Sequence, residues 1–159
     1  MTETGQPISA APETEVETQF DELEVDAPRV GIVMGSKSDM PTMEKAGEEL
    51  KRLGIGFEIR VMSAHRDPDV VAEYAKNASM RGLRAIVAGA GLAAALPGVV
   101  AAHTQLPVIG VPLVSENSVA GGLDAMLAIA QMPPGVPVAC VGVGAARNAA
   151  VLAARILAA

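Results

Sequence analysis

The sequence predicts an α/β domain in which helices cover both faces of a parallel sheet. Five short strand-forming segments alternate with segments of helical period, and the first of them is a continuous apolar run of the kind that forms a strand buried on both faces. Half of the 159 residues are apolar but only 2% are aromatic, so small aliphatic side chains and Met must build the core. A chain of this length suits one domain better than two.

The first strand is expected at 30–34, a continuous apolar run. Asp39 can cap the helix that follows, with Pro41 in its first turn and Gly54 at its end. The apolar side chains of this helix recur at spacings of three and four, which places them on one face: Met40, Met43, Ala46, Leu50 and Leu53.

The alternation continues to the C-terminus. A second strand is expected at 57–61, and Asp67 and Pro68 open a helix that ends near Gly82. Further strands are expected at 85–88, 107–111 and 137–141, and further helices at 93–102, 120–131 and 145–158. Strands separated by helices pair in parallel through right-handed crossovers.

Residues 1–28 differ in composition from the rest of the chain. They contain eight acids, no Lys or Arg and no apolar period, which predicts a disordered acidic N-terminal tail before a domain at 29–159. The remaining ten acids and twelve bases give that domain a net charge of +2 without a basic stripe. We therefore expect no nucleic-acid partner.

The sequence also predicts a soluble, cytoplasmic protein without a membrane partner. It shows no secretory signal, and Gly, Pro or polar residues interrupt every apolar stretch short of a membrane span. The single cysteine, Cys140, excludes an internal disulfide and lies in an apolar run. A small buried side chain is the favoured interpretation of Cys140, ahead of a nucleophile.

Parallel sheets bind ligands at the carboxyl ends of their strands, which selects the loops 35–39, 62–67 and 89–98. In the first loop, the hydroxyls of Ser36 and Ser38 can donate to phosphate oxygens, and Asp39 can accept from a ribose. The alternative is that Ser38 and Asp39 only cap a helix. The loop is not a Walker motif, so it does not indicate ATP.

The second loop contains Ser63, His65 and Arg66 between a strand end and a helix start. The guanidinium of Arg66 suits a phosphate, and histidine is the side chain best suited to proton transfer near neutral pH. The alternative is a structural histidine beside a surface ion pair. Adjacent His and Arg at a ligand-binding edge favour a functional role.

The third loop, 89–98, has no ionisable side chain. Backbone N–H groups and a small dry pocket could hold a flat heterocycle and a CO2 molecule there. A turn that only serves packing would have a similar sequence.

Five sequence blocks occur in a defined order: Val33–Asp39, Ser63–Arg66, Gly89–Gly98, Leu106–Pro112 and Gln131–Pro133. Together they resemble the class I N5-carboxyaminoimidazole ribonucleotide mutases over roughly 29–157. The resemblance implies a three-layer αβα, flavodoxin-like domain in a homo-octamer with sites at subunit contacts. It also implies a reaction of de novo purine biosynthesis without cofactor or metal. The carbamate of an imidazole ribonucleotide is lost as CO2, which then adds to ring carbon C4.

The resemblance also assigns roles to residues of this sequence. Ser36 and Asp39 would hold the phosphoribosyl group with help from Ser38 and Ser63, Arg66 would bind phosphate, and His65 would shuttle the proton. The pocket for CO2 and the imidazole would be lined by Gly89, Ala90, Gly91, Ala93, Ala94 and Leu96.

The sequence departs from the family pattern at three places. Ala95 stands where the family usually has His, Leu92 stands where it has Gly, and the chain stops at Ala159 where relatives often continue with another helix. Two alternatives to the mutase follow. One is direct carboxylation of aminoimidazole ribonucleotide by CO2, although those carboxylases usually have Lys at the position of Arg66. The other is a catalytically impaired nucleotide-binding or assembly homologue.

Overall fold

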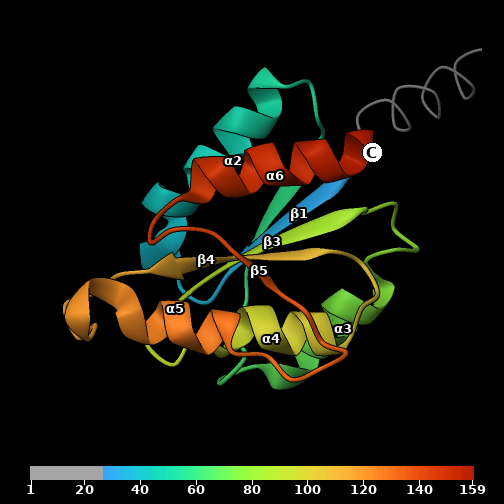
Figure 1. The fold of residues 1–159 in the computed structure, drawn as a ribbon. Coiled ribbons are helices and arrows are strands. Elements are labelled where there is room, and N and C mark those ends of the chain that lie inside the picture. The colour runs from blue at the N-terminus through green and yellow to red at the C-terminus, as the bar shows by residue number, and fades with distance from the viewer. Residues whose placement is uncertain (1–26) are drawn as a thin grey trace, which may run out of the picture.

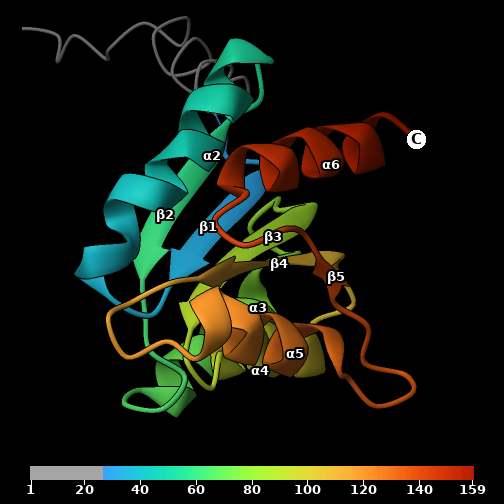
Figure 2. The same ribbon diagram turned by 60° about the vertical axis from the view of Figure 1, so that its left-hand side comes forward.

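The computed structural model describes residues 27–159, in which five parallel strands form one sheet. The predicted disordered tail lies outside the described residues apart from 27 and 28, so its disorder stays a prediction. The strands run in the order β2-β1-β3-β4-β5, which is the flavodoxin-like order. Their bounds are β1 Val30–Met34, β2 Phe57–Val61, β3 Ala85–Gly91, β4 Val108–Leu113 and β5 Ala139–Cys140. Figure 2 shows β2 and β5 at opposite edges of the sheet.

Helices cover both faces of this sheet (Figure 1). Helices α2 and α6 lie on one face, and α3, α4 and α5 lie on the other. Their bounds are α2 Met40–Arg52, α3 Pro68–Asn77, α4 Ala95–Ala102, α5 Leu123–Ala130 and α6 Ala146–Ala158, with short 3-10 turns η1 at Lys37–Asp39 and η2 at Ala120–Gly122. The predicted three-layer αβα fold is therefore confirmed. Among the described residues, no helix is long and apolar enough to cross a membrane.

Strand β1 shows why continuous apolar runs form the central strands of this fold, β1, β3 and β4. All five of its residues are buried. Ile32 and Met34 point to the face covered by α2 and α6, whereas Val33 points to the face covered by α3, α4 and α5. Because successive side chains point to opposite faces, a strand between two helix layers needs apolar residues at every position.

The structure corrects several predicted boundaries: α3 ends at Asn77 rather than near Gly82, β4 runs to Leu113 rather than to 111, and α5 starts at Leu123 rather than at 120. Three further corrections have a local cause. Strand β3 continues to Gly91 rather than ending at residue 88, because its backbone keeps pairing with β4 as far as Leu113. Strand β5 covers two residues instead of 137–141; it begins after Pro137, which has no N–H to donate to a neighbouring strand. Helix α4 starts at Ala95 rather than at 93, because Ala94 has a left-handed backbone with φ of 37°.

Helices α2 and α6 are joined by an ion-pair cluster around the buried side chain of Glu49. Its carboxylate accepts hydrogen bonds from Arg52 on α2 and from Arg147 on α6, each at 3.1 Å from Nε. The hydrogen bond from Arg52 lowers the pKa of Glu49, burial opposes this, and the charge of Arg147 lowers it again, leaving it below its usual range. The cluster therefore stabilises the fold above the ordinary glutamate pKa, and this stabilisation is lost as the pH falls through the lowered value.

Candidate active site

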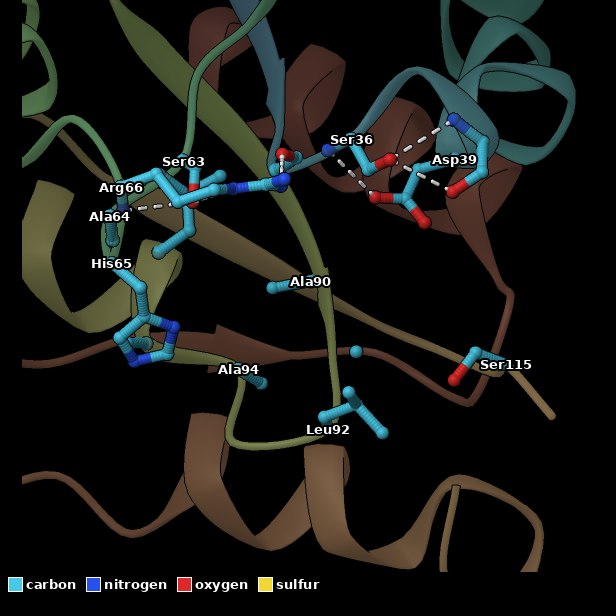
Figure 3. A pocket seen from close by; sticks show the side chains of 15 residues that line it. Ser36, Asp39, Ser63, Ala64, His65, Arg66, Ala90, Leu92, Ala94 and Ser115 are labelled. Atoms are coloured by element: carbon cyan, nitrogen blue, oxygen red, sulfur yellow. Dashed lines mark hydrogen bonds between the residues drawn. The ribbon is translucent and has the colours of Figure 1, made fainter. Parts of the chain in front are cut away.

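A pocket of about 220 Å³ lies at the carboxyl ends of β1, β2, β3 and β4. The connection after β1 runs to one side of the sheet and the connection after β3 to the other, so the pocket sits at the point where the strand order reverses. This is the usual ligand position in open parallel sheets. Its lining residues are Gly35, Ser36, Ser38, Asp39, Ser63, Ala64, His65, Arg66, Ala90, Gly91, Leu92, Ala94, Ala95, Leu96 and Ser115 (Figure 3).

The loop after β1 is held by its own side chains. The Ser36 N–H donates to Asp39 Oδ2 at 3.2 Å, and the Ser38 N–H donates to Ser36 Oγ at 3.3 Å. This reciprocal arrangement is a capping box. Asp39 was expected to cap α2 itself, but its backbone is already helical and its side chain makes no cap bond to that helix. Ser36 is the capping residue, because the turn η1 precedes α2.

The carboxylate of Asp39 is partly buried at the edge of the pocket. Burial raises the pKa of Asp39 above its usual range, and the hydrogen bond from the Ser36 backbone lowers it by less. Because burial raises this pKa, ionisation of Asp39 lowers the free energy of unfolding. A ligand hydroxyl that donates to this carboxylate would offset part of that loss.

The loop after β2 is tied to the loop after β1 by Arg66. Its Nη2 donates to the carbonyl oxygen of Gly35 at 3.0 Å, and its Nε donates to Ser63 Oγ at 3.2 Å. The Arg66 side chain is exposed, and a guanidinium carries five N–H donors, so others remain for a ligand. His65 is also exposed and lies on the opposite side of the pocket from Asp39 in Figure 3.

The segment from β3 into α4 forms the uncharged side of the pocket. It contributes Ala90, Gly91, Leu92, Ala94, Ala95 and Leu96, which we call the apolar floor. In Figure 3 the side chains of Ser36, Asp39, Ser63 and Arg66 lie across the pocket from Leu92 and Ala94; we call these four residues and Ser38 the polar rim. The pocket thus offers hydrogen bonds and charge on one side and apolar surface on the other.

The structure brings together ten of the twelve residues that the sequence singled out. Gly89 and Ala93 are the two that do not line the pocket. Gly89 faces α2 instead, where a Cβ atom would lie 2.5 Å from the sulfur of Met43. Its lack of a side chain therefore allows the close approach of α2 to β3.

Gly35, Ala64, Leu92 and Ala95 also line the pocket; they lie within the three loops that the sequence selected but were not named among the site residues. Ser115 is the one lining residue outside those loops; it lies two residues after the end of β4, at the same carboxyl edge of the sheet. Among residues 27–159, no group of three or more His, Cys, Asp or Glu side chains could hold a metal ion. Cys140 is half-buried away from the pocket, and burial raises the pKa of its thiol.

Fold and pocket define a flavodoxin-like α/β protein with a pocket at the point where its strand order reverses. More narrowly, the chain belongs to the AIR carboxylase family, whose model matches residues 29–159.

Named relatives agree with this membership. The chain is 58% identical over 130 residues to an N5-carboxyaminoimidazole ribonucleotide mutase of Thermotoga maritima, a match that covers 82% of this chain and 75% of the relative. It is 57% identical to the mutase of Saccharolobus solfataricus, covering 82% of this chain and 81% of the relative. The crystal structure of Treponema denticola PurE superposes with a TM-score of 0.73 at 36% identity, covering 82% and 80% of the two chains.

Proposed function

We propose that this protein is an N5-carboxyaminoimidazole ribonucleotide mutase, which forms 4-carboxy-5-aminoimidazole ribonucleotide in purine biosynthesis. The observation that carries the proposal is a single pocket that combines a polar rim, an apolar floor and a histidine. Relatives bearing the mutase name, at more than half identity over most of the chain, support the same conclusion.

The polar rim suits the phosphoribosyl part of the substrate. Ser36, Ser38 and Ser63 supply hydroxyl donors, and Arg66 supplies a fixed positive charge for the phosphate. Asp39 supplies an acceptor for a ribose hydroxyl. The hydrogen bonds of Arg66 to Gly35 and Ser63 orient its guanidinium before the ligand arrives, which lowers the entropy cost of binding.

The apolar floor suits the imidazole and the CO2 released from the carbamate. CO2 has no net charge and few groups to bind, so a small pocket that excludes water is the means of retaining it. Ala90, Gly91, Ala94 and Ala95 leave room beside the backbone and add no competing acid or base.

The reaction needs one proton to be taken up and one to be released. The C–N bond of the carbamate breaks, CO2 leaves, and the exocyclic nitrogen gains a proton. Ring carbon C4 then attacks the carbon of CO2, a C–C bond forms, and the C4 proton leaves. Among the described residues that line the pocket, His65 is the one histidine, and we assign it both transfers.

The proposal extends to a closed homo-oligomer, an octamer, working in the cytoplasm. Exposed apolar side chains gather around η2 and α5, and apolar patches of this kind mark interfaces. We call this surface the α5 patch and define it as Val114, Val119, Leu123, Leu127 and Val143.

Direct carboxylation of aminoimidazole ribonucleotide is the second candidate, because the family description names AIR carboxylase. One experiment separates the two. Purified protein is incubated with N5-carboxyaminoimidazole ribonucleotide without ATP, and in parallel with aminoimidazole ribonucleotide and bicarbonate, and the C4-carboxylated product is followed. The mutase proposal expects much faster formation from the carbamate. Faster formation from aminoimidazole ribonucleotide would establish the carboxylase, and no product from either would leave a non-catalytic homologue.

A further inference from the structure

Leu92 occupies a backbone position that favours glycine. Its φ is 55°, a left-handed value that a side chain with a Cβ adopts at a cost in free energy. The Ala94 N–H donates to the carbonyl oxygen of Gly91 at 2.9 Å, which closes a tight turn with Leu92 at its first central position. Glycine is the residue that such a turn ordinarily takes.

The side chain of Leu92 also lacks the burial that leucine usually has. It is 43% exposed, whereas Leu96, the other leucine of the apolar floor, is 2% exposed. Figure 3 shows Leu92 between Ala94 and Ser115 along one side of the pocket. Backbone strain and exposed apolar surface therefore coincide at one residue of the pocket, and strain of this kind is concentrated at functional sites.

We propose that Leu92 is a specificity-determining residue that packs against the planar imidazole ring of the bound ribonucleotide. This inference rests on the proposed function, because it takes the ligand to be an imidazole ribonucleotide. The charged and hydroxylated parts of that ligand match the polar rim across the pocket. The faces of the ring are its apolar part, and Leu92 has the largest unburied apolar side chain on the floor.

A distinction between two ligands follows from this placement. Leu92 contributes to binding of the complete ribonucleotide, since ring and side chain bury apolar surface against each other. It contributes nothing to binding of ribose 5-phosphate, which has no ring to cover. A residue that only shaped the loop would affect both ligands alike.

The test compares Leu92→Ala, Leu92→Gly and Leu92→Met with the wild type, using calorimetric titration of 5-aminoimidazole ribonucleotide and of ribose 5-phosphate. We expect the Ala and Gly variants to bind the ribonucleotide roughly five- to ten-fold more weakly, the scale of a partly buried aliphatic side chain. Ribose 5-phosphate affinity should not change, and Leu92→Met should keep wild-type affinity for both. Leu53→Ala, at a comparably exposed leucine (39%) at the end of α2, is the matched control and should change neither.

Thermal unfolding of the same variants shows that the loss is not a loss of structure. Leu92→Gly should raise the melting temperature, because glycine relieves the positive φ, while its ribonucleotide affinity falls. Unchanged ribonucleotide affinity in the Ala and Gly variants, or equal weakening of both ligands, would overturn the inference.

The mutase assay separates this inference from the proposed function. A protein that binds the ribonucleotide through Leu92 but forms no product would contradict the function alone. An active enzyme indifferent to Leu92 would contradict the inference alone. A wild-type protein that does not bind the ribonucleotide would overturn both.

Discussion

Arg66 donates a hydrogen bond to the carbonyl oxygen of Gly35 at 3.0 Å, although the two residues lie 31 positions apart in the sequence. The contact joins the loop after β2 to the loop after β1, because these strands are neighbours in the sheet and their carboxyl ends meet at one edge. The same guanidinium contacts Ser63. One side chain therefore organises the polar rim and presents its remaining donors to the pocket.

Replacing Arg66 should weaken substrate binding before it affects the chemical step. We expect Arg66→Ala to raise KM roughly 10- to 100-fold with a smaller change in kcat, the scale of lost charge-assisted hydrogen bonds. Arg66→Lys should have a KM between those of the wild type and Arg66→Ala, because lysine keeps the charge but lacks the planar guanidinium that reaches Gly35 and Ser63. Steady-state kinetics measure both parameters. A KM unchanged by Arg66→Ala would remove Arg66 from the phosphate site.

Asp39 offers a test in which stability and function move in opposite directions. Because burial raises its pKa, the ionised carboxylate destabilises the fold at pH values above that pKa. Asp39→Asn removes the charge, and its amide oxygen can still accept from the Ser36 N–H. We expect a small rise in melting temperature near pH 7 that disappears as the pH falls below the ordinary aspartate value of 3.8.

The same Asp39→Asn substitution should lower substrate affinity roughly 10-fold or more, since a ligand hydroxyl loses its charged acceptor. Asp39→Ala is the control for the capping box: it loses the bond from Ser36 and should be less stable than the wild type at neutral pH. A fall in melting temperature for Asp39→Asn near pH 7 would show that the charge supports the fold.

Strand positions and the ligand-binding edge could be predicted from the sequence because both depend on local patterns. A run such as Val30–Met34 identifies a buried strand, and the residues that follow it must reach the carboxyl edge of the sheet. Ser36, His65 and Arg66 were found in this way, and all three line the pocket.

What the sequence could not predict depends on backbone geometry and on contacts between distant segments. The turn η1 moves the capping role from Asp39 to Ser36, and nothing in the residue types distinguishes these alternatives. The positive φ of Leu92 and Ala94 contradicts the preference of both residue types. The sequence predicted that Gly89 lines the pocket as part of the loop 89–98. The structure places Gly89 within β3, where it contacts Met43 of α2.

The α5 patch predicts assembly through this face of the molecule. Its side chains are between 38% and 64% exposed, and a Cβ at Gly122 would lie 2.9 Å from Val114 and 3.1 Å from Val143, so these two valines flank η2 together. We expect multi-angle light scattering to show a stable oligomer at micromolar concentration. Leu127→Glu should shift it to smaller species, whereas Val70→Glu, outside the patch on α3, should not. A wild-type monomer would contradict both the assembly and sites at subunit contacts.

The last prediction concerns His65 and tests the chemical step itself. Transfer of CO2 from nitrogen to carbon requires a proton to reach the departing nitrogen and another to leave C4, and a histidine in the pocket can perform both. His65→Asn keeps a side chain of similar size with a hydrogen-bonding group but cannot carry a proton. We expect kcat to fall roughly 10²-fold or more, the usual scale for losing a general acid–base, with little change in KM. The pattern should be the reverse of that for Arg66→Ala, because the polar rim stays intact. Asp39 is the one carboxylate that lines the pocket, so it is the alternative proton carrier. A near-normal kcat for His65→Asn together with an inactive Asp39→Asn would assign the proton transfers to Asp39 and contradict the proposed mechanism.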